Sequence, residues 1–170
     1  MELQRYIGRE LSGLKMAMDR VLDSLTQQEL SWRPASGCNS IGLILFHIAR
    51  SEDSIMQGIL QGKPQIWKSG KWHEKMNLSD GEAGNHYTVE QVNAFQVPEL
   101  SDILAYHDAV RAKTKEYLRG MKIEEFEKEV TFPNIGELPI ASIFSLIVTH
   151  TSEHIGEMSY LRGLQRGLDK

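Results

Sequence analysis

The chain has 170 residues, of which 41% are hydrophobic and 25% are charged, and its formal net charge is −4. This composition is typical of a globular protein, and the length predicts one domain over residues 1–170 with its own buried core. Basic residues form no long run, so we expect neither nucleic-acid nor membrane binding. Cys38 is the single cysteine, which excludes an intrachain disulfide, and the first residues lack the apolar core of a signal peptide. We therefore expect a cytoplasmic protein.

Apolar residues at helical spacing, with charges between them, predict a long amphipathic helix over residues 3–25. A loop rich in turn residues follows, and Ser40 is the expected N-cap of a second helix over residues 41–60. Residues 61–87 show no clear period, so we expect a long irregular loop after the second helix. A loop of this length in a compact domain is usually functional or mobile.

The second half of the chain predicts two further long helices. Thr88 begins a capping-box pattern, and residues 99–119 have the spacing of a third long helix. A short extended segment is expected around residues 130–132, with no obvious partner strand. Pro139 suits the first turn of a last helix that runs to about Arg166. Four long helices with almost no strand signal predict an all-α protein, a four-helix bundle with antiparallel neighbours.

The apolar face of the last helix carries ionisable residues at its centre. Residues four apart lie one above the other on a helix, about 5–6 Å between Cβ atoms, so His150 and His154 can converge on one ion. Glu153 directly precedes His154, which is not the zincin order, so a zincin-type base is not expected. Core histidines satisfied by hydrogen bonds, or a chance pair on a solvated face, are alternative interpretations. Read at steps of three and four, this face carries Ile140, Ile143, Ile147, His150, His154, Glu157, Leu161 and Leu164.

The second predicted helix adds a third histidine. His47 lies between Phe46 and Ile48, in the most apolar stretch of this helix. Three imidazoles from two facing helices leave at least one coordination position open, which is typical of a catalytic metal site. Zinc and nickel both suit imidazole ligands. Without a metal, three buried imidazoles would be difficult to satisfy with hydrogen bonds.

Two segments of the sequence carry a family resemblance. In "LSWRPASGCNSIGLILFHIARSEDSIM" a Trp-Arg-Pro loop leads into a helix with a histidine after an apolar run, and "THTSEHIGEMSYLRGLQ" places a His-x-x-x-His before Tyr-Leu-Arg. Through these two segments and their order, nearly the whole chain resembles the DinB-like (damage-inducible) superfamily of metal-binding four-helix bundles. The resemblance implies that His47, His150 and His154 are the metal ligands. It also implies a homodimer, as in many members.

The same resemblance implies classes of function. Characterised relatives include transferases that join a low-molecular-weight thiol such as bacillithiol to an electrophile, and a mycothiol-dependent isomerase. We therefore expect a divalent-metal-dependent enzyme that activates a small thiol for S-transfer to a small-molecule substrate. A metal-dependent hydrolase of a small substrate and a non-enzymatic metal-binding stress or interaction module are the alternatives.

Other residues near the predicted site have both a functional and a structural interpretation. Glu157 and Ser51 each lie one turn from a candidate ligand and could orient it by a hydrogen bond, or could serve only in an ion pair or in packing. Arg50 or Arg162 would suit a substrate carboxylate, although arginines are more often solvated surface residues. The remaining histidines, which we expect to be exposed or outside the site, are His73, His86 and His107.

Overall fold

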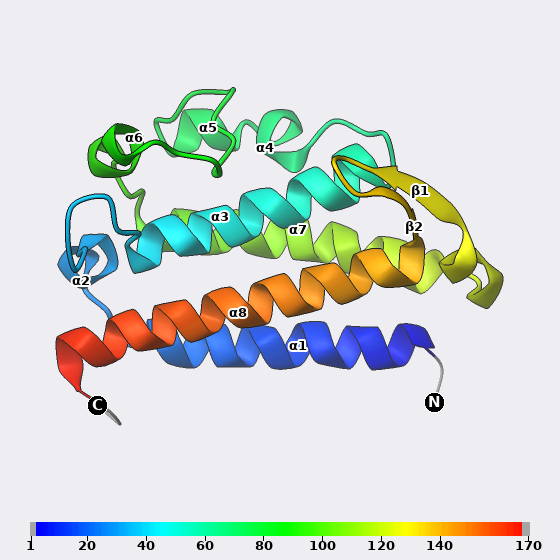
Figure 1. Cartoon of the computed structure of the whole chain (residues 1–170), viewed down its shortest axis with the longest axis horizontal. Coiled ribbons are helices and arrows are strands. Elements are labelled where there is room, and N and C mark those ends of the chain that lie inside the picture. The colour runs from blue at the N-terminus through cyan, green and yellow to red at the C-terminus, as the bar shows by residue number, and fades with distance from the viewer. Residues whose placement is uncertain (1–2, 168–170) are drawn as a thin grey trace.

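A four-helix bundle forms the centre of the computed structural model, which describes residues 3–167 (Figure 1). Its helices are α1 (Leu3–Leu22), α3 (Ile41–Asp53), which continues as the π-helix η1 (Ser54–Ile59), α7 (Leu100–Gly120) and α8 (Ile140–Arg166). These bounds confirm the four long helices and the all-α fold class predicted from the sequence. No helix within residues 3–167 has both the length and the hydrophobicity that crossing a membrane requires.

Side-chain caps determine where several helices begin. The Ser40 hydroxyl accepts a hydrogen bond from the backbone N–H of Leu43, so α3 starts at the predicted N-cap. Thr88 and Gln91 form the predicted capping box at the start of α6 (Val89–Ala94). In both cases a short polar side chain satisfies an amide that the first helical turn leaves unpaired.

The short helix α2 (Gln27–Ser31) lies where the sequence analysis expected only a loop. Thr26 and Glu29 form a reciprocal capping box at its start. The Thr-x-x-Glu spacing that produces this box is present in the sequence and is the signal that predicts a helix start here.

The connection between α3 and α7 covers α3 and reverses the chain. It contains α4 (Ile66–Ser69), α5 (Trp72–Lys75) and α6, which lie above α3 in Figure 1. The predicted irregular loop is thus partly helical. Because this connection returns the chain to the end where α3 began, α7 runs in the same direction as α3.

Two neighbouring helix pairs of the bundle are therefore parallel. Arg50 contacts Tyr106 and Glu52 contacts Arg111, so residue numbers increase together along α3 and α7. Helices α1 and α8 also run in the same direction (Figure 1). The expectation that neighbouring helices would be antiparallel was wrong for these two pairs, because the long connection between α3 and α7 returns the chain before α7 begins.

A β-hairpin joins α7 to α8. Strands β1 (Glu129–Phe132) and β2 (Gly136–Pro139) pair antiparallel. The extended segment predicted around residues 130–132 is confirmed, and β2 is the partner strand that the sequence analysis did not find. Asn134 and Gly136 have positive φ values of 63° and 107°, which the tight turn requires and which these two residue types tolerate well.

The buried face of α8 turns gradually away from the predicted face. Ile140, Ile143 and Ile147 are buried as predicted, but Leu164 is 50% exposed. A straight α-helix has 3.6 residues per turn, so a face read at an average step of 3.5 drifts by about 20° every seven residues. The two histidines consequently lie at the edge of the core rather than at its centre. The residues that are buried beyond His150 are Thr151, Ile155, Met158 and Leu161.

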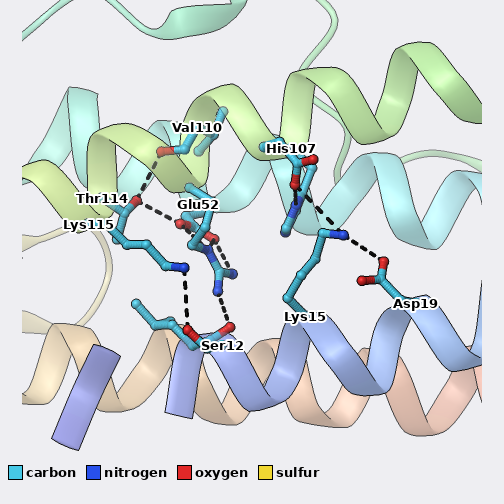
Figure 2. A network of polar contacts seen from close by, with 11 residues as sticks. Ser12, Lys15, Asp19, Glu52, His107, Val110, Thr114 and Lys115 are labelled. Atoms are coloured by element: carbon cyan, nitrogen blue, oxygen red, sulfur yellow. Dashed lines mark hydrogen bonds and ion pairs between the residues drawn. The ribbon is translucent and has the colours of Figure 1, made fainter. Parts of the chain in front are cut away.

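A buried ion pair links three of the bundle helices (Figure 2). The Arg111 guanidinium bonds the Glu52 carboxylate, with 2.6 Å between Nη2 and Oε2, and also donates to the Leu11 carbonyl of α1. The Thr114 hydroxyl donates to Glu52 Oε1 at 2.6 Å. Burial alone would raise the pKa of Glu52, but the charge of Arg111 and these hydrogen bonds outweigh burial and lower it. The pair thus ties α3 to α7 and to α1.

Candidate metal centre

Three histidine rings meet between α3 and α8. His150 Nε2 lies 3.0 Å from His47 Nε2 and 3.1 Å from His154 Nε2. Histidine nitrogens that share one ion at about 2.1 Å are roughly 3.0–3.4 Å apart in octahedral or tetrahedral geometry. The sequence prediction that these three residues come together is thus matched by their positions, and one ring nitrogen from each lies within 4.8 Å of the other two, close enough to hold a single metal ion.

Two of the rings are oriented by acceptors on their outer side. His47 Nδ1 is 2.7 Å from the carbonyl oxygen of Gly84, and His154 Nδ1 is 2.7 Å from the carboxylate of Glu157. Both partners only accept hydrogen bonds, so each ring carries a proton on Nδ1. In the neutral form its Nε2 therefore presents a lone pair to the centre of the cluster, which is the arrangement common among metal-ligating histidines.

The inner nitrogens fit a cation better than they fit each other. His150 Nε2 faces both neighbours and can donate at most one proton, so at least one lone pair in the cluster lacks a donor. Burial lowers the pKa of His47, and burial together with His154 lowers that of His150 to about 4. Both rings are thus neutral near pH 7. A divalent ion would satisfy all three lone pairs at once.

A cavity of about 260 Å³ opens beside the histidine cluster. His47 and His154 form part of its wall, so a molecule in the cavity lies next to the open side of the cluster. The apolar side chains of Leu43, Ile44 and Val92 form another part. Within residues 3–167, neither a carboxylate nor a lysine or arginine lines this cavity.

His86 is a candidate functional residue that the sequence analysis placed in an exposed loop. Its side chain is exposed, as expected, but it also lines the cavity beside His47 and His154. Its φ of 54° is uncommon for a residue other than glycine and belongs to the turn that brings the segment back over α3. The neighbouring Tyr87 hydroxyl donates to Glu82, and burial raises the pKa of this phenol above its ordinary value.

Several other residues considered in the sequence lie away from the cluster. The described hydrogen bonds of His47 go to Gly84 and His150 and not to Ser51. Arg50 is buried in contacts with other parts of the protein, and Arg162 donates to backbone carbonyls of α1 and the loop after it, so neither lines the cavity. His107 is buried on α7, and His73 packs beside Trp67.

Comparisons with known proteins agree with this fold. The family model described as the DinB superfamily matches residues 10–158, a range that includes all three clustered histidines. A crystal structure described as that of a conserved protein of a locus from Enterococcus faecalis superposes with a TM-score of 0.85, at 23% identity, over 96% of this chain and 97% of that chain. A search of curated proteins found no significant match. Since the family match spans most of the sequence, the chain belongs to the DinB superfamily.

Proposed function

We propose that this protein binds a divalent metal ion, zinc or nickel, through His47, His150 and His154 and activates a small thiol for transfer to an electrophile. The observation that carries the proposal is the convergence of three Nε2 atoms, two of them on rings that outer acceptors already orient. When bound, such an ion lowers the pKa of a thiol or water that it coordinates. Imidazole suits both metals.

The cavity supports a thiol rather than water as the nucleophile. Hydrolysis commonly uses a carboxylate to accept a proton from water, and among the described residues none lines the cavity. The carboxylate nearest to the cluster, that of Glu157, is bonded to His154. A thiol is a stronger acid than water, so once it is coordinated a weaker base such as an imidazole is sufficient to take its proton. The apolar wall of Leu43, Ile44 and Val92 suits the carbon skeleton of an electrophile.

Within this proposal, His86 accepts the proton that the thiol releases. Its ring lines the cavity together with two of the proposed ligands. Tyr87 is unsuited to this role because its hydroxyl is bonded to Glu82 and its pKa is raised. An imidazole ring can take up a proton at one nitrogen and release it again, which suits this role.

The test combines elemental analysis with a conjugation assay on protein purified without a histidine tag. We expect about one zinc or nickel per wild-type chain and loss of this metal in the His150→Ala, His154→Ala double variant. His73→Ala is the matched control, because His73 lies outside the cluster, and it should retain the metal. Conjugation of a small thiol to an electrophile should require both metal and thiol.

The outcomes distinguish the alternatives. Turnover in the absence of thiol would identify a hydrolase instead of a transferase. Stoichiometric metal without turnover of either kind would favour a non-enzymatic module. Metal retained by the double variant, or absent from the wild type after reconstitution, would overturn the ligand assignment itself.

A further inference from the structure

We propose that residues 65–84 act as a strap that positions His47, and that Arg50 and Asp53 fasten this strap to α3. The inference rests on the proposed metal site and extends it to residues that do not touch the ion. Gly84, at the end of the strap, supplies the carbonyl that accepts the hydrogen bond from His47 Nδ1. The residues that hold the strap therefore control the orientation of a proposed ligand.

Asp53 fastens the beginning of the strap. Its fully buried carboxylate accepts hydrogen bonds from the backbone N–H groups of Ile66 and Trp67, each at 2.8 Å, and from the Tyr106 hydroxyl at 2.7 Å. The first amides of a helix have no partner within the helix, so Asp53 satisfies two of them at the start of α4. A buried carboxylate with three such donors holds its partners in a defined geometry.

Arg50 fastens both ends of the strap with one guanidinium group. Its Nη2 donates to the Gln65 side chain at 2.9 Å, and its Nε donates to the Glu82 carbonyl at 3.0 Å. Its Nη1 donates to the Tyr106 hydroxyl at 2.9 Å, which joins the strap to α7 as well. Arg50 is only 5% exposed, so water competes little for these bonds. The substrate-binding role considered from the sequence is thus replaced by a positioning role.

Gly84 connects the strap to His47 through its backbone carbonyl. It lies two residues after Glu82 and has a φ of +74°, and a Cβ added to it would approach Cβ and Cγ of Arg50 to 2.9 Å. The backbone at Gly84 therefore lies directly against Arg50, which is one helical turn beyond His47 on α3. A side chain at this position would push the carbonyl away from His47, in addition to straining the left-handed backbone.

The test compares Gly84→Ala with Gly81→Ala, a matched change in the same strap. Gly81 lacks a positive φ in the left-handed range, and the nearest atom to an added Cβ is 3.7 Å away. We expect Gly84→Ala to weaken zinc binding by roughly 10–100-fold, the usual effect of losing the outer partner of a ligating histidine. Gly81→Ala should bind zinc as the wild type does. Competition with a chromophoric chelator measures both affinities.

A second readout uses the protein without metal and without substrate. Nitrogen-15 NMR of the histidine rings should show His47 protonated on Nδ1 in the wild type and in Gly81→Ala. Gly84→Ala should show a mixture of the two tautomers. A loss of packing alone, with the Gly84 carbonyl still in place, would not change this tautomer.

Arg50→Lys tests independently whether the Arg50 guanidinium holds the strap on α3. Lysine keeps the positive charge but cannot bond Gln65, Glu82 and Tyr106 together, so we expect a loss of zinc affinity in the same direction. Wild-type affinity and an unchanged His47 tautomer in both Gly84→Ala and Arg50→Lys would overturn the strap. Zinc binding without thiol conjugation in the wild type would instead contradict the proposed reaction and leave the strap supported.

Discussion

Glu157 shows how one exposed residue can orient and tune a half-buried histidine ring. Its carboxylate lies one turn after His154 on α8 and accepts a hydrogen bond from Nδ1 of that ring. The charge on the carboxylate makes His154 Nε2 a better electron donor, because it stabilises positive charge on the imidazole. The effect is reduced by solvent, since the Glu157 side chain is 53% exposed.

We predict that Glu157→Gln lowers zinc affinity by about tenfold, at the lower end of the usual range for such partners because of this exposure. The amide oxygen can still accept from Nδ1, but it lacks the charge. Glu153→Gln on the same helix is the matched control, and titration calorimetry compares the two. Equal affinities in the two variants would show that Glu157 does not support His154.

Residues on the long helices were predictable at this scale, and residues in the connection between α3 and α7 were not. His150, His154 and Glu157 occupy positions on α8 whose spacing places them on one face, and His47 stands out as a histidine in the apolar stretch of α3. Gly84 and His86 lie in a segment without periodicity. Their positions depend on the buried contacts of Arg50 and Asp53, which join residues distant in the sequence and leave no local pattern.

At the scale of elements, the Glu52–Arg111 pair determines how α3 and α7 pack. We predict that Arg111→Met lowers the free energy of unfolding by about 3–5 kcal/mol, because it leaves the Glu52 carboxylate buried without its cation. Chemical denaturation measures this change. Lys113→Met is the control on the same helix, since Lys113 pairs with Glu116 at the surface, and it should change stability by less than about 1 kcal/mol.

The Glu52–Arg111 pair should also make the difference in unfolding free energy between wild type and Arg111→Met depend on pH. The pKa of Glu52 is lower in the folded chain than in the unfolded chain, so its ion pair stabilises the fold above the unfolded value of about 4.3. As the pH falls below that value, the unfolded chain takes up the proton first and the stabilisation is lost. The difference in free energy of unfolding between wild type and Arg111→Met should therefore become smaller at acidic pH. A gap that stayed constant down to pH 3 would contradict the role assigned to the charge.

The long helices could be predicted from the sequence. Most of the short elements and the relative directions of the helices could not, because they depend on tertiary contacts. The apolar periods, and Ser40 as the cap of α3, placed the long helices correctly, and Thr88 placed the start of the short helix α6. Strand β2 has only four residues and is stabilised by pairing with β1, so its own composition carries little information. The parallel direction of α3 and α7 follows from the path of residues 60–99, which has no regular period.

At the scale of the whole molecule, the proposed site joins two helices, α3 and α8, that pack against each other in the bundle. A ligand that binds the folded chain alone stabilises it by about 2.7 kcal/mol at one hundred times its dissociation constant. For a chain of this size we therefore predict that zinc at this concentration raises the melting temperature by roughly 5–10 °C relative to chelator-treated protein. Calorimetry should show no such rise for His47→Ala, and an equal rise in that variant would place the ion elsewhere.

The distribution of the three histidines along the chain has a consequence for biosynthesis. His47 and His150 are 103 positions apart in the sequence. His150 and His154 both belong to the last helix. At about 5–20 residues per second, a ribosome needs roughly 5–20 s to travel from the first ligand to the second. A nascent chain that stops before α8 already contains three of the four long helices but only one of the three proposed ligands. Binding of the ion by all three side chains would then have to follow the synthesis of α8.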